Sequence, residues 1–336
     1  MTASVVVLGG AGYIGSHMAK ALSRAGHAVT VFDNLSTGHR DAARFGRFIE
    51  GDLRDPGALK HLFGSARFDA VMHFAALCYV GESMRKPHEY YGNNVVGTIN
   101  LLDAMRAAEV RQLVFSSSCA TYGNPQCQPM DETHRQMPVN PYGMTKFTAE
   151  RAVADYGAAY GLRAVALRYF NAAGCDPEGE LGERHEPETH LIPLVLQEAL
   201  RVKAGGTPEK TALRINGDDF ETADGTCVRD YVHVSDLCSA HLQALERLRR
   251  DGEDRFEAFN LGNGKGFSIK EVIAVCREVT GADIRYAVGP RRAGDPPALV
   301  ADARKAREVL GWQPRFDRLQ DIVRTAWDWM RARAGA

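Results

Sequence analysis

A tyrosine and a lysine four residues apart, Tyr142 and Lys146, are the residues of this sequence best suited to acid–base chemistry. They follow Asn140 and Pro141, and asparagine favours a helix-capping position while proline favours the first helical position. A helix that begins there places Tyr142 and Lys146 one turn apart on one face. A tyrosine is a poor base at its ordinary pKa of about 10. A neighbouring ammonium and a cationic cofactor ring favour the phenolate, so we predict a proton-transferring tyrosine whose pKa falls toward the working pH.

Three consecutive hydroxyl side chains, Ser116 to Ser118, end the apolar run that precedes this segment. Three hydroxyls at the end of a strand are more than a turn needs, and we predict that Ser118 contacts the substrate. A tyrosine and a lysine at this spacing are common by chance and usually mark a solvated helix face. The interpretation as a catalytic pair therefore depends on the serine-ended strand and on the glycine-rich turn at the start of the chain.

The first eighteen residues predict a strand, a tight turn and a helix. An apolar run over residues 5–8 leads into Gly9, Gly12 and Gly15, and Gly10 completes a second, overlapping G-x-G-x-x-G spacing. Glycines at these spacings permit a tight turn, close approach of a pyrophosphate to the backbone and close packing of the helix on the strand. The amides at the start of the helix then face an anion. The turn is typical of a dinucleotide-binding site.

Acidic residues follow the next two apolar runs. Asp33 closes the second run eighteen residues after Gly15, where a carboxylate accepts hydrogen bonds from ribose hydroxyls and repels a 2′-phosphate. This position predicts NAD as the cofactor in preference to NADP. Asp52 follows the third run and could reach the adenine amino group, or it could instead cap the helix after Pro56. The residues leave both alternatives open.

Strand-like and helix-like segments alternate through the first half of the chain. Six apolar runs lie near residues 4–8, 28–32, 47–50, 70–74, 112–117 and 163–168, with helical stretches near 13–26, 57–64, 88–108 and 141–160. The fourth run ends in Phe74, Ala75 and Ala76, and the small alanines let the backbone approach a cofactor. Strands that are apolar on both faces favour a parallel sheet covered by helices on both sides. We predict an α/β fold, a doubly wound parallel (Rossmann) sheet with a smaller α/β substrate-binding lobe.

The second half of the chain has a looser pattern. Past Asn171, segments rich in glycine, proline and acidic residues separate shorter elements. We predict a cofactor-binding domain over residues 1–175 and a substrate-binding domain over residues 176–336. The chain is expected to return to the first domain near residues 231–262.

Composition bounds the function class. The chain has 336 residues, 45% of them hydrophobic and 25% charged, and a formal net charge of -1 with no basic stripe. This composition predicts an ordinary soluble globular protein with no nucleic-acid partner. Seven cysteines, odd in number and without a C-x-x-C pair, read as reduced thiols and give neither a disulfide framework nor a zinc site. A strand that starts near residue 4 leaves no room for a signal peptide, and no apolar stretch approaches 18 residues, so we expect a cytoplasmic protein with no membrane contact and no metal.

These motifs together resemble the extended short-chain dehydrogenase/reductase family, and most closely its UDP-glucose 4-epimerase members, over nearly the whole chain. The resemblance rests on the Gly9 to Gly15 turn, Asp33-Asn34-Leu35, Gly51-Asp52, Phe74 to Ser83, Tyr91 to Asn94, Ser116 to Ser118, Tyr142 to Lys146, Arg168 to Asn171, Asp224 to Tyr231 and Arg291 to Asp295.

The resemblance implies a tightly held NAD and a UDP-sugar substrate. The implied cofactor contacts are Gly9, Gly12, Tyr13, Ile14, Gly15, Asp33, Asn34, Asp52, Leu53, Phe74, Ala75, Ala76, Asn93, Lys146 and Phe170. The implied substrate contacts are Ser118 and Tyr142 at the sugar, and Asn171, His190, Leu191, Asn216, Arg229, Arg292 and Asp295 toward the UDP moiety. Arg229 and Arg292 sit in stretches that read as loops, and a guanidinium fork fits a diphosphate.

Three positions depart from the best-known pattern of the family. Cys78 stands where some members have a lysine near the cofactor, His190 where some have asparagine, and Asn216 where an aromatic side chain often flanks the uracil. Nothing near His190 in the sequence would orient it as a general base. These departures bear on affinity more than on the type of reaction.

The implied reaction is the interconversion of UDP-glucose and UDP-galactose by transient oxidation at sugar C4. Leu299 occupies a position that walls the sugar pocket in the family and would admit UDP-N-acetylhexosamines as slower substrates, or it could point into the core and gate nothing. Relatives often dimerise through two helices, here residues 95–108 and 147–160, although their alanine-rich faces would equally suit packing on the sheet.

Other functions stay open at this point. One is an epimerase or 4,6-dehydratase of a related nucleotide sugar, although a dehydratase typically carries an acid pair where Cys119-Ala120-Thr121 follows Ser118. A protein of a different class, a non-catalytic NAD-binding regulator, would tolerate the loss of Tyr142 or Lys146, and both are present.

Overall fold

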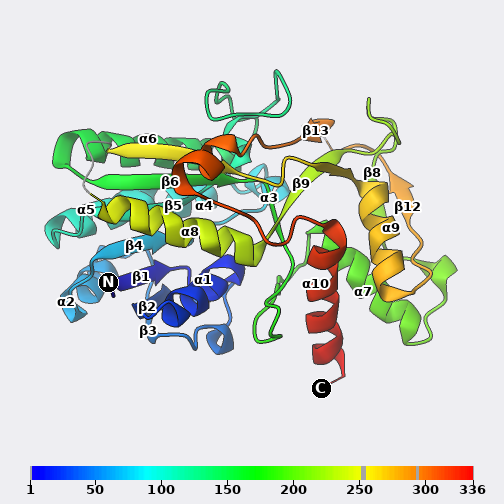
Figure 1. The fold of residues 1–336 in the computed structure, drawn as a ribbon, viewed down its shortest axis with the longest axis horizontal. Coiled ribbons are helices and arrows are strands. Elements are labelled where there is room, and N and C mark those ends of the chain that lie inside the picture. Colours follow the sequence, from blue (N-terminus) through cyan, green and yellow to red (C-terminus); the bar gives the residue numbers. More distant parts are fainter. Residues whose placement is uncertain (1, 251–254, 293–294, 336) are drawn as a thin grey trace.

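A seven-stranded sheet, parallel throughout, forms the larger part of the molecule in the computed structural model, which describes residues 2–250, 255–292 and 295–335 (Figure 1). Its strand order is β10-β6-β5-β4-β1-β2-β3. The strands are β1 (Ser4–Leu8), β2 (Ala28–Asp33), β3 (Arg47–Glu50), β4 (Ala70–His73), β5 (Gln112–Ser118), β6 (Arg163–Tyr169) and β10 (Phe256–Leu261). The chain places β2 and β3 on one side of β1 and then continues with β4 on the other side. The loops after β1 and β4 therefore diverge at the carboxyl ends of the strands, which is the edge where doubly wound sheets bind ligands.

Helices cover both faces of this sheet, as the apolar runs predicted. Val5 and Val7 of β1 face one core with α1 (Tyr13–Arg24) and α8 (Val234–Arg249). Val6 and Leu8 face the other core. That second core also contains residues of α2 (Pro56–Ser65), α5 (Gly97–Ala107) and α6 (Pro141–Tyr160). Alternate residues of one buried strand thus serve two layers, which confirms the predicted doubly wound fold.

A smaller part lies at the carboxyl ends of the strands and carries two further sheets (Figure 1). One sheet joins β7 (Asn171–Ala173), β9 (Val228–His233), β11 (Gly266–Ser268) and β13 (Ala298–Leu299), and the other joins β8 (Arg214–Asn216) to β12 (Ala287–Gly289). Helices α7 (Leu191–Lys203), α9 (Ile269–Thr280) and α10 (Leu319–Ala334) share its core. The chain returns to the larger sheet with α8 and β10; the predicted boundary at residue 175 stays a prediction.

Short helical segments complete the chain. They are η1 (Arg40–Ala42), α3 (Val80–Ser83), α4 (Pro87–Tyr90), η2 (Tyr91–Val96), η3 (Cys119–Thr121), η4 (Pro208–Lys210) and η5 (Ala306–Leu310). Within the described residues, no helix combines the length and apolarity needed to span a bilayer.

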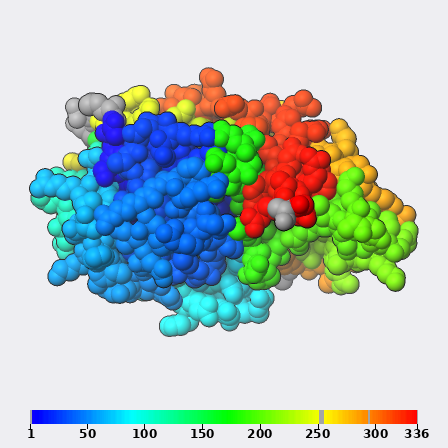
Figure 2. Space-filling model, turned by 90° about the horizontal axis from the view of Figure 1, so that it is seen from below, coloured from blue at the N-terminus to red at the C-terminus, as the bar shows by residue number. Residues whose placement is uncertain are grey.

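Residues 174–190, here called the bridging segment, connect the two parts. Figure 2 shows them in green between the blue N-terminal region and the red C-terminal helix. On one side, Lys20 of α1 pairs with Asp176 at 2.5 Å. On the other side, a Cβ placed on Gly182 would overlap the indole ring of Trp329 in α10. The bridging segment is therefore held from both parts of the molecule.

Candidate active site

The predicted glycine turn between β1 and α1 is present, and its glycines are required by close contacts. Gly9 has a φ of +76°, and a Cβ placed on it would lie 2.5 Å from the backbone nitrogen of Ala75 after β4. A Cβ on Gly15 would overlap the carbonyl oxygen of Gly9. Gly12 precedes α1 and provides no capping side chain. The first helical amides, starting at Tyr13, have no acceptor within the helix and are free to bind an anion.

Asp33 ends β2 beside this turn. Its two carboxylate oxygens accept hydrogen bonds from the backbone amides of Ala11, at 2.9 Å, and Leu35, at 2.8 Å. Burial raises the pKa of Asp33, and the two amide hydrogen bonds oppose that rise. Each carboxylate oxygen can accept a further hydrogen bond. The carboxylate thus holds the glycine turn in place and can still accept hydrogen bonds from a ribose. Only ribose binding was predicted from the sequence.

Asp52 does not cap the helix that follows it. The N-cap of α2 is Asp55, whose Oδ1 accepts from the amide of Gly57 at 2.7 Å. Asp52 instead accepts from the side chains of Asn34, at 2.8 Å, and Arg54, at 2.6 Å. The hydrogen bonds from Arg54 hold the pKa of Asp52 well below its usual range. The capping alternative was wrong because only Asp55 lies directly before the helix, whereas Asp52 remains at the strand edge beside Asn34.

The predicted acid–base residues meet at the ends of β5 and α6. Asn140 caps α6, with its side-chain oxygen accepting from the amide of Gly143 at 2.8 Å. This cap places Tyr142 in the first turn, close enough to Ser118 for the serine hydroxyl to act on the tyrosine pKa. One turn later, Lys146 donates from Nζ to the carbonyl oxygen of Ser116 at 2.8 Å.

The pKa values of Tyr142 and Lys146 are both shifted toward the neutral form, which differs from the predicted fall in the tyrosine pKa. Burial raises the pKa of Tyr142 well above 10, the nearby Cys78 thiol adds to the rise, and the hydrogen bond with Ser118 only partly opposes it. Burial also lowers the pKa of Lys146 to about 8. The expected fall in the tyrosine pKa does not occur in the chain alone, because burial disfavours the charged form of both groups.

The residues predicted to contact the cofactor after β4 and in η2 lie beside the glycine turn and α6, because Ala75 approaches Gly9 and η2 packs with α6. Ala75 and Ala76 are half-buried, and the ring of Phe74 packs 4.8 Å from that of His241. Asn93 donates to Asn94, at 3.0 Å. Its neighbour Asn94 is the more important structural residue, because it also bonds both backbone groups of Leu77 and the hydroxyl of Thr145 in α6. Sequence reasoning did not single out Asn94, although the Asn-Asn pair was a visible signal.

The remaining predicted cofactor residues lie nearby on the same edge. Leu53 is buried against Gly97 of α5. Ile14 is partly buried on the core beneath α1, and the Tyr13 hydroxyl donates to the carbonyl oxygen of Gly174 at 2.5 Å. Phe170, between β6 and β7, is buried in a small apolar cluster with Cys119.

Arg229 and Asp295 form one polar group of the smaller part. Arg229 lies in β9, so its predicted loop position was wrong; β9 becomes a strand only by pairing with segments far away in the chain. Its guanidinium donates to the carbonyl oxygen of Pro296 at 3.0 Å and lies 3.7 Å from the Asp295 carboxylate. Arg292 is exposed, and its carbonyl accepts from the amide of Asp295 at 3.2 Å. Ala293 and Gly294 of the same motif lie outside the described residues.

Leu299 lies where the two parts meet. It sits opposite Arg229 in the register of β13 and β9. It is half-buried against the apolar cluster that contains Phe170 and Cys119, the residue after Ser118. Asn171 begins β7, opposite Tyr231 of β9. Leu299 is thus packed beside the strand that carries Ser118 but is not fully buried.

The structure separates the other predicted substrate contacts. Asn216 is exposed at the end of β8 in the two-stranded sheet, and Leu191 begins α7 and packs on the core of the smaller part. His190 precedes α7, and its Nδ1 is in hydrogen-bond contact with the carboxylate of Glu183. The expectation that nothing orients His190 was wrong, because Glu183 lies seven residues away in a segment whose path no periodicity predicts. Burial lowers the pKa of His190, but Glu183 outweighs burial and raises it.

The described residues fit a dinucleotide at this edge. The bare backbone of the glycine turn, the free amides of α1 and the carboxylate of Asp33 follow β1 and β2, while the Tyr142 cluster follows β5. Their order along the edge matches a pyrophosphate at the helix start, a ribose at the acidic residue and a reactive ring toward the tyrosine.

The chain matches the model of the NAD dependent epimerase/dehydratase family over residues 5–262. It belongs to this family. It is 51% identical to the UDP-glucose 4-epimerase of Halalkalibacterium halodurans, over 97% of this chain and 95% of that protein.

Solved structures give the same result. The crystal structure of UDP-glucose 4-epimerase from Brucella ovis in complex with NAD superposes with a TM-score of 0.91 at 51% identity, covering 97% of this chain and 98% of that one. The UDP-glucose-4-epimerase of Stenotrophomonas maltophila, with bound NAD and formylated UDP-arabinopyranose, gives a TM-score of 0.91 at 40% identity, covering 99% of each chain.

Proposed function

We propose that this protein is an NAD-dependent isomerase that interconverts UDP-glucose and UDP-galactose. The observation that carries the proposal is the placement of Tyr142 beside Ser118 at the same sheet edge as the glycine turn and Asp33. Relatives about half identical over nearly their whole length are UDP-glucose 4-epimerases, which supports the same reaction.

NAD is the cofactor of this reaction and supplies a hydride acceptor and donor for sugar C4. The amides after Gly12 would hold its pyrophosphate, and Asp33 and Asp52 its adenosine half. Lys146 would hold the ribose next to the reactive ring. Its Nζ carries three donors, and the carbonyl oxygen of Ser116 uses one of them.

Tyr142 moves the proton at the sugar 4-hydroxyl. Its hydroxyl lies near Ser118, whose Oγ is held by accepting from the amide of Ala120 at 3.1 Å. Because burial raises the tyrosine pKa, proton removal needs added positive charge, which Lys146 and the cofactor ring would bring. The proton returns to the same oxygen when the opposite configuration at C4 is formed.

The UDP moiety provides most of the affinity. Arg229 and Arg292 would bind the diphosphate, and Asn171 and Asp295 would bind next to it, as charge-assisted hydrogen bonds are the stronger ones. His190 carries added positive character from its contact with Glu183 and suits the same anionic group. The hexose must present both faces of C4, so few fixed contacts to it are expected.

We infer a homodimer that forms through α5 and α6. The two helices pack side by side, with the Tyr156 hydroxyl donating to Asp103 at 2.9 Å. Val96 and Ile99 have exposed fractions of 51% and 38% next to this pair, where large apolar side chains favour a partner. Ile99→Glu should shift the mass in solution from dimer to monomer, and an unchanged mass would contradict this interface.

We place the protein in the cytoplasm. Its seven cysteines are free thiols, as is usual in a reducing compartment.

The decisive experiment is incubation of the purified protein with UDP-galactose and no added NAD. The expected result is conversion to UDP-glucose up to an equilibrium mixture, with repeated turnovers on the NAD that copurifies. A 4-keto-6-deoxy product would identify a dehydratase instead. Absence of any product from protein that contains stoichiometric NAD would support a non-catalytic role.

A further inference from the structure

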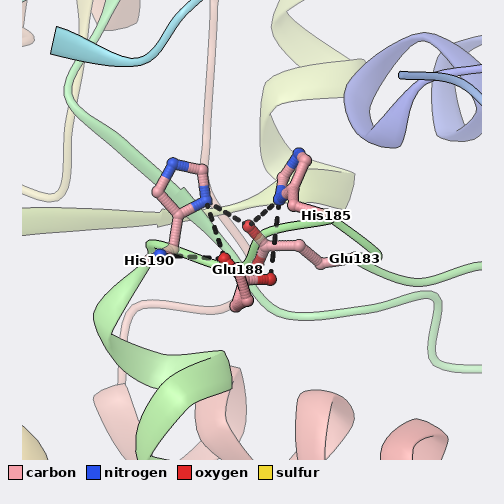
Figure 3. Close-up of side chains that lie close together, drawn as sticks. All are labelled: Glu183, His185, Glu188 and His190. Atoms are coloured by element: carbon pink, nitrogen blue, oxygen red, sulfur yellow. Dashed lines mark hydrogen bonds and ion pairs between the residues drawn. The ribbon is translucent and has the colours of Figure 1, made fainter. Parts of the chain in front are cut away.

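Four side chains of the bridging segment form a second polar cluster outside the acid–base group. Glu183, His185, Glu188 and His190 each offer one nitrogen or oxygen atom, and all four atoms lie within 4.8 Å of one another. Figure 3 shows the two imidazole rings directed at the same pair of carboxylates. Sequence reasoning named no metal site, although the spacing E-x-H-x-x-E-x-H was visible.

The cluster is closed on three sides. The side chains of Glu183 and Glu188 are 5% and 6% exposed and that of His185 is 13% exposed, while His190 is 43% exposed. The ring of His185 is held edge-on by Tyr13, at 6.2 Å between centroids, and by Tyr79, at 5.9 Å. Of the four side chains, His190 is the one open to solvent, so we expect an ion to enter on its side.

Two buried carboxylates require compensating positive charge, because an unpaired buried charge is costly. The two histidines can supply it as imidazolium ions. A divalent cation supplies the same charge with neutral imidazoles. Nδ1 of His185 faces both carboxylates, 3.3 Å from Glu183 and 3.6 Å from Glu188, and an ion held between these groups would meet the same three atoms.

The distances agree with one ion between the four atoms. A tetrahedral zinc ion with bonds of about 2.1 Å separates its ligand atoms by about 3.4 Å. The two contacts of His185 are 3.3 Å to Glu183 and 3.6 Å to Oε2 of Glu188, and His190 lies 3.9 Å from Oε1 of Glu188. The contact between His190 and Glu183 is closer and must open to admit an ion. His190 is the most exposed of the four and can move.

We propose that Glu183, His185, Glu188 and His190 form a binding site for Zn²⁺ or a similar transition-metal ion. Two imidazole nitrogens and two carboxylate oxygens suit Zn²⁺, whereas Mg²⁺ and Ca²⁺ prefer oxygen ligands alone. The ligands come from the segment that joins the two parts of the molecule. An ion there would fix the segment that carries His190.

The neighbouring acidic group provides a matched control. Asp176, Glu178 and Glu180 also lie close together, but Lys20 and Arg24 already pair with them, and no nitrogen ligand faces them among the described residues. Glu178→Gln therefore removes a carboxylate from the bridging segment without touching the proposed site. His88→Gln removes an exposed histidine and controls for weak surface binding.

The test uses full-length protein, with its NAD, after treatment with a chelator. Titration with ZnCl₂, followed by calorimetry and metal analysis, should give one Zn²⁺ per chain. His185→Gln and Glu188→Gln should each raise the Kd by more than the 10- to 100-fold typical for loss of a residue that only supports a ligand. Glu178→Gln and His88→Gln should leave the Kd unchanged. Co²⁺ should give the intense visible bands of a tetrahedral site in wild type and lose them in the ligand variants.

Several outcomes would overturn the proposal. Zinc binding that survives His185→Gln, or Mg²⁺ binding as tight as Zn²⁺ binding, would place the metal elsewhere or show no built site. If His185→Gln does not fold, His190→Asn repeats the test at the most exposed ligand. Because metal content and the Co²⁺ spectrum are measured without substrate, failure here is distinguishable from failure of the proposed epimerase activity.

Discussion

Two lysines of this protein are buried to the same extent but differ in their surroundings. Lys146 and Lys20 are each 4% exposed. Lys20 has carboxylate oxygens of Asp176 and Glu180 at 2.5 Å. Among the described residues, no carboxylate lies within salt-bridge distance of Lys146. Changing each lysine to methionine, which is similar in length and uncharged, separates the cost of burial from the gain of pairing.

The pKa of buried Lys146 determines how the stability difference between wild type and Lys146→Met changes with pH. Burial lowers its pKa from 10.5 to about 8, so the folded state favours the neutral amine. The charged form is therefore penalised below pH 8, and raising the pH from 8 to 10.5 removes the penalty. Between pH 7 and pH 10 the wild type should gain about 2 to 3 kcal/mol in free energy of unfolding relative to Lys146→Met. Any packing difference made by methionine does not change with pH in this range.

The pKa of Lys20 is shifted in the opposite direction to that of Lys146. Burial alone would lower its pKa, but the hydrogen bond with Asp176 and those with Glu180 and Glu178 outweigh burial and raise it. Lys20→Met leaves Asp176 buried without its partner. The variant should lose about 1.5 to 3 kcal/mol at pH 7, the usual size of a hydrogen bond to a charged group.

The assay is urea unfolding of NAD-stripped wild type, Lys146→Met and Lys20→Met at pH 7, 8.5 and 10. The expected result is that the stability of Lys146→Met relative to wild type falls by about 2 to 3 kcal/mol between pH 7 and pH 10. A difference between these two proteins that stays constant from pH 7 to pH 10 would refute the reasoning, because Lys146 would then titrate as an ordinary lysine.

Three further predictions concern the proposed reaction. Tyr142→Phe should lower kcat by at least about 100-fold while NAD content and the Kd for UDP-sugars stay nearly unchanged, because only the hydroxyl carries the proton; near-wild-type turnover would contradict the assignment. Asp33→Ala should lower retained NAD, narrow the preference against NADP and destabilise the protein by about 1 to 3 kcal/mol, because the amide of Ala11 loses its acceptor; unchanged NAD content after gel filtration would argue against it. UDP-glucose and UDP-galactose should be the main substrate pair and the N-acetyl pair slower, with Leu299→Ser raising and Leu299→Tyr lowering kcat/KM for UDP-N-acetylgalactosamine relative to UDP-galactose, by roughly 5- to 150-fold; a constant ratio would show that Leu299 gates nothing.

Local signals were enough to predict the cofactor edge and the start of α6. The glycine turn requires glycine at Gly9 and Gly15 for contacts within a few residues or with the next strand, and Asn140 with Pro141 begins α6 at the predicted residue. The six predicted apolar runs coincide with β1 to β6 of the larger sheet. Strands buried on both faces are apolar at every position, and such runs can be recognised in the sequence. These features depend on short stretches of sequence.

Features that depend on distant contacts could not be predicted. Arg229 lies in a strand only because β9 pairs with β7, β11 and β13, which lie up to seventy residues away. The contact between His190 and Glu183 depends on the path of the bridging segment, which is fixed by α1 and α10. The pKa of Tyr142 depends on the burial contributed by many residues, and no spacing encodes that sum.

The raised pKa of Tyr142 and the lowered pKa of Lys146 have one consequence for the reaction. Both shifts favour the neutral form, so the chain by itself holds an un-ionised tyrosine beside a lysine that loses its proton near pH 8. In the reaction proposed above, proton transfer would therefore depend on positive charge brought in by the cofactor. Such a site would be a poor base without NAD and a competent one with NAD bound, which would tie acid–base activity to the presence of the hydride acceptor. Ultraviolet titration of NAD-stripped protein should accordingly show no tyrosinate from Tyr142 at neutral pH.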